Sequence, residues 1–157
     1  MKARTMQQWL DAYGVSHRNA TNKAIHWVCV PIIYFTMVGF LYSIPMPDAP
    51  PFSTPHVWAK LAIGLVGIFY LTISFPIMIG MMLWSAFCYG LCVYLDVHAP
   101  WPLWAICGVL FVVAWVGQFY GHKVEGAKPS FFEDLQFLLI GPAWLMSFIY
   151  RKLGVPI

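Results

Sequence analysis

The sequence predicts an all-α, polytopic integral membrane protein with four to five transmembrane helices and an N-terminal helix on the membrane surface. Of its 157 residues, 61% are hydrophobic and only 10% are charged, a balance outside the range of ordinary soluble domains. The hydrophobic residues gather in stretches of roughly 20, the length that a helix needs to cross a bilayer core. Residues 1–157 are therefore expected to form a single membrane domain.

The first 24 residues are predicted to form an interfacial segment. Its apolar residues recur at helical spacing on one face: Met6, Trp9, Leu10 and Tyr13. This pattern is typical of helices that lie in the headgroup region of a membrane. The segment has no apolar core of the signal-peptide kind, so the first long hydrophobic stretch is expected to remain as a membrane helix.

Five hydrophobic stretches predict five helices, at residues 25–44, 59–75, 76–95, 101–120 and 132–150. A proline-rich connector separates the first two. The second and third are contiguous, and a single helix over both would be about 55 Å long, too long for one crossing. A tight turn is therefore expected near Pro76. Gly141-Pro142 interrupts the last stretch, which either spans the membrane or re-enters it.

The basic residues predict the orientation. They cluster in the N-terminal segment and in the loop after the fourth stretch: Lys2, Arg4, Arg18, Lys23, Lys123 and Lys128. Four crossings separate these two regions, so they lie on the same side, which the positive-inside rule makes cytoplasmic. The short loops favour a bacterial inner membrane, with the endoplasmic reticulum as the eukaryotic equivalent.

Two classes of site are not expected. The net charge of +3 is small and dispersed, so nucleic acid is not a predicted partner. The four cysteines, which fall inside hydrophobic stretches without zinc-like spacing, are expected to be reduced and buried: Cys29, Cys88, Cys92 and Cys107.

Polar residues at two distant positions in the chain are expected to meet at the cytoplasmic face. Asn22 and His26 enter the first membrane helix four residues apart. Gln118 and His122 leave the fourth helix with the same spacing, and Glu125 follows three residues later. Residues three and four apart share one face of a helix. Each helix therefore offers an amide one turn from an imidazole.

Together with His17, which precedes the first membrane helix, these side chains suggest a metal centre. His17, His26, His122 and Glu125 match the ligands of a non-haem iron or zinc site. Five histidines are too few for the clustered sets of membrane di-iron enzymes, so a mononuclear site is expected. The alternative is an interfacial rim of polar residues that binds no metal.

The remaining polar residues receive supporting roles or none. Asn22 and Gln118 either orient the imidazoles or join the helices by hydrogen bonds. His98 lies about 20 helical residues from His122, roughly 30 Å away, and His56 lies in the proline-rich connector. Both are therefore excluded from the site.

Two sequence blocks carry a family resemblance: His17-x4-Asn22-x3-His26-x4-Pro31 and Gln118-Phe119-x-Gly121-His122-x2-Glu125-x3-Pro129. They resemble the yeast 2-hydroxy-palmitic acid dioxygenase family, small endoplasmic-reticulum membrane proteins of fatty acid α-oxidation with bacterial relatives. The resemblance extends to Gly141-Pro142 and covers most of the chain in hydropathy. Glu125 and Pro129 each stand one position closer to His122 than in the family pattern, which keeps Glu125 near the same helix face.

The resemblance implies an Fe(II)-dependent dioxygenase whose essential histidines match His17, His26 and His122. Its substrates would be dioxygen and a long-chain 2-hydroxy fatty acid, which loses one carbon by cleavage of the C1–C2 bond. The acyl chain would lie among the membrane helices. Arg18 or Lys123 could pair with the substrate carboxylate, although contact with membrane lipid headgroups also accounts for Lys123.

Two other functions stay open. A zinc-dependent membrane lipid hydrolase could use the same histidines, with Glu125 as general base to a metal-bound water. A non-enzymatic lipid-binding or scaffold protein would need no metal. Neither the oligomeric state nor the acyl chain length follows from the sequence.

Overall fold

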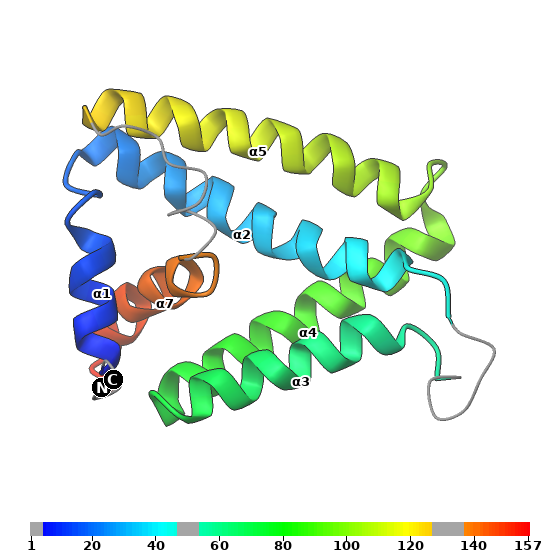
Figure 1. Ribbon diagram of the computed structural model, residues 1–157, viewed down its shortest axis with the longest axis horizontal. Helices are drawn as coiled ribbons and strands as arrows, with labels where there is room; N and C mark the ends of the chain where they lie inside the picture. Colours follow the sequence, from blue (N-terminus) through cyan, green and yellow to red (C-terminus); the bar gives the residue numbers. More distant parts are fainter. Residues whose placement is uncertain (1–4, 47–53, 127–136) are drawn as a thin grey trace.

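The computed structural model describes residues 5–46, 54–126 and 137–157, and these residues form helices without any strand (Figure 1). The all-α prediction is confirmed for them. The helices are α1 (Met6–Gly14), α2 (Ala20–Ser43), α3 (Val57–Leu71), α4 (Phe75–His98), α5 (Leu103–Glu125) and α7 (Ile140–Lys152). Some positions named above lie outside the described residues: Lys2, Arg4, Lys128, Pro129 and 132–136.

Three of the described helices are long and apolar enough to cross a membrane, namely α2, α4 and α5. They have 24, 24 and 23 residues, so each is about 35 Å long. The shorter apolar helix α3 has 15 residues and α7 has 13, so both fall short of a core about 30 Å thick. The expected count of four to five spans is therefore not confirmed.

The helices that carry the polar residues are longer than predicted. α2 begins at Ala20 because the Asn19 side chain accepts hydrogen bonds from the next backbone N–H groups and caps the helix. α5 continues to Glu125, and Gly126 follows as its C-cap. The φ of Gly126 is 79°, a left-handed conformation that ends helices and that glycine adopts without strain. Asn22, His26 and His122 thus stand on regular helix.

The tight turn predicted near Pro76 is confirmed. α3 ends at Leu71, and Ser74 caps α4 by accepting a hydrogen bond from the backbone N–H of Ile77. Pro76 lies in the first turn of α4, where its missing N–H would have had no partner in the helix.

Gly141-Pro142 does not interrupt a helix, contrary to the prediction for the last stretch. The pair lies in the first turn of α7, which begins at Ile140. The reason is the same as for Pro76, since proline is tolerated at a helix start. The described part of this stretch is therefore a turn at residues 137–139 followed by one short helix.

The helices form two pairs that are held together at one end by α1 and α7 (Figure 1). α2 and α5 run antiparallel side by side, and α3 and α4 form a hairpin beside the second half of α2. The two pairs diverge toward the start of α2, where α7 packs on α1, α2 and α4. The first residues of α2 and the last residues of α5 therefore share one end of the molecule.

The N-terminal helix forms as predicted, but protein covers its apolar face. Met6, Leu10 and Tyr13 are buried, and α1 packs on α7. The ring centroids of Tyr13 and Trp144 lie 5.4 Å apart. The apolar face of α1 is thus buried against α7. The spacing of apolar residues within α1 could not reveal this contact.

α2 and α5 approach closely because two glycines of α5 face α2. A Cβ atom on Gly117 would lie 2.7 Å from the sulfur of Cys29, and one on Gly121 would overlap the amide oxygen of Asn22. Small residues four apart permit this close approach between apolar helices. The described cysteines are free and buried, as predicted.

Gly121→Ala should destabilise the protein by about 1–3 kcal/mol, because the added methyl group would push Asn22 out of place. Gly108→Ala in the same helix is the matched control, since nothing lies within 4 Å of a Cβ there. Alanine is the better helix former by about 1 kcal/mol, so the control should be neutral or slightly stabilising. Thermal unfolding in detergent micelles measures both, and equal melting temperatures for the two variants would contradict this account.

Candidate metal centre

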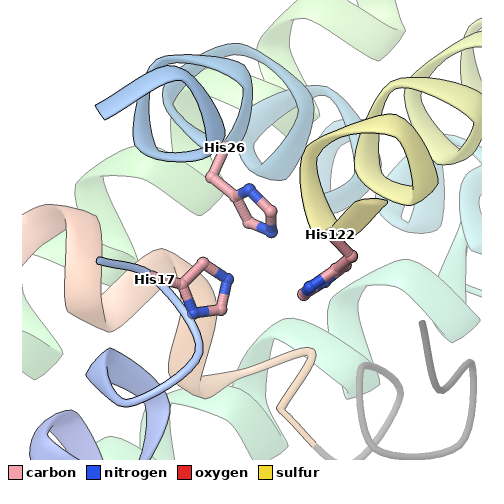
Figure 2. Close-up of side chains that lie close together, drawn as sticks. All are labelled: His17, His26 and His122. Atoms are coloured by element: carbon pink, nitrogen blue, oxygen red, sulfur yellow. The ribbon is translucent and has the colours of Figure 1, made fainter. Parts of the chain in front are cut away.

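Three buried histidines from different parts of the chain point toward one another (Figure 2). His26 comes from α2, His122 from α5, and His17 from the link between α1 and α2. Their side chains are 1%, 4% and 2% exposed, in that order. One ring nitrogen of each lies within 4.8 Å of those of the other two. We call these residues the histidine triad.

The rings of the triad stand nearly perpendicular to one another. The centroid of His17 is 4.3 Å from that of His26 and 5.5 Å from that of His122, and His26 and His122 are 5.2 Å apart. The angles between the ring planes are 82°, 70° and 84°. Rings in this arrangement do not stack, so they can turn nitrogen atoms toward a common point.

Backbone carbonyls set the tautomers of two of these rings. Nδ1 of His17 lies 2.7 Å from the carbonyl oxygen of Tyr13, and Nδ1 of His26 lies 2.9 Å from that of Asn22. A carbonyl only accepts, so Nδ1 carries the hydrogen and donates it. In the neutral form of such a ring the lone pair is on Nε2, as in many metal-binding histidines. Imidazole nitrogens are ligands that zinc and iron take, so the buried triad fits a metal ion.

Aromatic residues hold His17 in place. The Tyr13 ring stacks on it with centroids 4.1 Å apart and an angle of 13°, and the Trp144 ring of α7 lies 5.4 Å away. Neither residue was predicted from the sequence as part of the site. Tyr13 could have been found from its position four residues before His17, one helical turn, whereas no sequence signal connects Trp144 with the site.

Glu125 lies outside the group of converging nitrogens. Its Oε1 accepts a hydrogen bond from the backbone N–H of Arg18 at 2.8 Å, and its Oε2 accepts one from that of Asn19 at 2.9 Å. These N–H groups precede α2 and have no partner within the helix. A carboxylate is also favoured at a helix start by the helix dipole. Glu125 thus connects the end of α5 to the loop that carries His17. We call these two hydrogen bonds the Glu125 latch.

Asn22 joins this latch to the triad. Its side chain is 0% exposed, and its Nδ2 donates to Oε2 of Glu125 at 3.0 Å and to the carbonyl of Ser16 at 3.2 Å. Its own backbone carbonyl is the partner of His26. Of the two roles predicted for Asn22, orienting the imidazoles and joining the helices, the geometry is compatible with both.

The other predicted site residues lie at different distances from the triad. Gln118 is buried one turn before His122 and lines a cavity of about 30 Å³. Arg18 lines an open groove of about 400 Å³ that also contacts His17. Lys123 is exposed and is not part of this groove. Two further cations that were not predicted as site residues, Lys23 and Arg151, do line it.

His56 and His98 lie apart from the triad, as predicted. His56 stacks on Tyr42, and its Nδ1 lies 3.0 Å from the carbonyl oxygen of that residue. Tyr42 stands sixteen residues beyond His26 in α2, about 24 Å along the helix. His98 bonds in the same way to the carbonyl of Tyr94. A hydrogen bond between a histidine Nδ1 and a backbone carbonyl is therefore not specific to a metal site. What distinguishes the triad from His56 and His98 is that its three rings converge.

Comparison with known proteins supplies the family. No curated protein and no solved structure matches the chain. The family model described as 2-hydroxy-palmitic acid dioxygenase Mpo1-like matches residues 3–153. Because this match spans nearly the whole chain, including the triad, the protein belongs to the 2-hydroxy-palmitic acid dioxygenase Mpo1-like family.

Proposed function

We propose that the protein is a membrane-embedded, Fe(II)-dependent dioxygenase that shortens long-chain 2-hydroxy fatty acids by one carbon. The observation that carries this proposal is the buried histidine triad in a chain whose family is named for a 2-hydroxy fatty acid dioxygenase. His17, His26 and His122 would hold the ion, each through one ring nitrogen. Fe(II), when bound, supplies the redox chemistry by which dioxygen reacts with the substrate.

The protein around the triad contributes positioning and exclusion of water. Carbonyl partners fix the ring tautomers of His17 and His26, and burial shields the triad from solvent. The Glu125 latch holds the loop with His17 against α5. Arg18, which lines the groove beside His17, would pair with the substrate carboxylate.

The reaction balances without a further co-substrate. One 2-hydroxy acid and one dioxygen molecule give the fatty acid with one carbon less, carbon dioxide and water. The C1–C2 bond breaks, and the former α-carbon is oxidised to a carboxyl group while dioxygen is reduced. This is the α-oxidation step proposed for the protein.

The membrane assignment follows from the three long apolar helices, α2, α4 and α5. We place the triad end of the molecule at the cytoplasmic surface, since Arg18, Lys23 and Lys123 lie near this end. An inner bacterial membrane is the proposed compartment. A fatty acid presents its carboxylate at such a surface and its chain toward the bilayer interior, which matches a site at the helix ends.

Oxygen consumption tests the function directly. Protein purified without oxygen and loaded with Fe(II) should consume one dioxygen molecule per 2-hydroxypalmitate and form pentadecanoic acid, detected by mass spectrometry. Palmitate, which lacks the hydroxyl, is the control and should give no uptake above background. Equal uptake with both acids would contradict the proposal, and oxygen-independent cleavage of lipid esters by the zinc-loaded protein would favour the hydrolase.

A further inference from the structure

A small cavity lies about one helical turn from His26 and His122, on the side away from the helix ends, and its lining includes none of the three histidines. Val30 lines it one turn after His26, and Gln118 lines it one turn before His122. Tyr13, which stacks on His17, forms another wall. The volume of about 30 Å³ has room for about one or two molecules the size of water.

A separate apolar groove of about 140 Å³ lies between α2 and α3. Leu138 lines both spaces, so they share a wall. Met37 and Leu41 of α2 and Ala62 of α3 line the groove further along. Tyr34 also lines it, but its hydroxyl is hydrogen-bonded to Ser85 at 2.6 Å. The groove therefore has an apolar lining with no charged side chain among the described residues.

The lining residues of α2 form one stripe that begins at the triad. After His26, they recur once per helical turn, as single residues or adjacent pairs: Val30, Ile33 and Tyr34, Met37 and Val38, and Leu41. This spacing keeps them on one helix face. The stripe from Val30 to Leu41 is about 16 Å long, close to the roughly 15 Å of one hydrocarbon leaflet.

We propose that the acyl chain of the substrate runs from the triad past Leu138 into the groove between α2 and α3, and that Ala62 limits its length. This inference rests on the proposed function. α3 runs antiparallel to α2 (Figure 1), so the N-terminal half of α3, with Ala62, faces the part of α2 far from His26. A small side chain there leaves room for the chain end.

Ala62→Trp tests this placement, because a bulky ring would obstruct the groove. The ratio of kcat/KM for 2-hydroxypalmitate to that for 2-hydroxyoctanoate should fall by roughly tenfold or more. Ala105→Trp is the matched control, since Ala105 is also half-buried and lines an apolar groove on α5 that shares no residue with the cavity beside the triad. It should leave the ratio unchanged.

A photoreactive substrate gives a second readout that needs no variant and no turnover. With a diazirine at its terminal carbon, 2-hydroxypalmitate bound without oxygen should label α3 near Ala62, as found by peptide mass spectrometry. Labelling of the groove at Ala105, or an unchanged ratio in Ala62→Trp, would overturn the acyl site. Turnover of neither acid by the Fe(II)-loaded wild type would instead overturn the proposed function, even if the label reached α3.

Discussion

Replacing His26 and His122 together with alanine should remove the bound metal and reduce turnover more than about 100-fold. Loss of residues that merely orient metal ligands costs 10- to 100-fold, and this double variant removes two ligands of the proposed centre. His17 would remain as a single imidazole in a buried site, too little to hold Fe(II) at micromolar concentration. Elemental analysis of protein purified without oxygen measures the loss directly.

The matched control for the double variant is His98→Ala. His98 makes the same bond from Nδ1 to a carbonyl four residues earlier as His26 does, yet it stands at the C-terminal end of α4, remote from the triad. It should keep the metal content and turnover of the wild type. A double variant that still binds iron in wild-type amount would refute the triad as the metal site, and zinc in the wild type would favour the hydrolase.

Asn22→Asp should destabilise the protein by on the order of 3 kcal/mol and weaken metal binding about 10- to 100-fold. The substitution replaces a buried N–H donor with a carboxylate that faces the carbonyl of Ser16 and the carboxylate of Glu125. Two like charges would then meet where a hydrogen bond exists. Because Asn22 joins the Glu125 latch to His26, its displacement should disturb both sides of the triad. Thermal unfolding and iron titration measure the two effects.

The variant Asn22→Asp, Glu125→Gln should recover part of this loss. An amide at position 125 can donate to a carboxylate at position 22, so the hydrogen bond reappears with its direction reversed. Recovery should be incomplete, because the amide no longer offers two acceptor oxygens to the N–H groups of Arg18 and Asn19. A double-mutant cycle of melting temperatures gives the coupling between the two positions. Strict additivity of the two substitutions would show that the latch does not act through Asn22.

The sequence alone was sufficient for the all-α class and for the meeting of the triad helices. Hydrophobic stretches of spanning length predicted helices, and the even number of predicted crossings placed the start of the first helix on the same side as the end of the fourth. That Gln118 and His122 share one helix face then followed from the helical period alone, which is a local property of the backbone. The helix ends were predicted less well, since the extension of α2 depends on the cap that Asn19 forms.

Only the tertiary structure decided which polar groups converge and which support them. Glu125 has the chemistry of a ligand, but its carboxylate is taken up by the N–H groups of Arg18, Asn19 and Asn22. Trp144 is distant in sequence from His17 yet lies 5.4 Å from its ring. The helical period determines which residues share a face, whereas the packing of all side chains determines what that face meets. The sequence therefore determined the helices and the candidate residues, and long-range packing decided their partners.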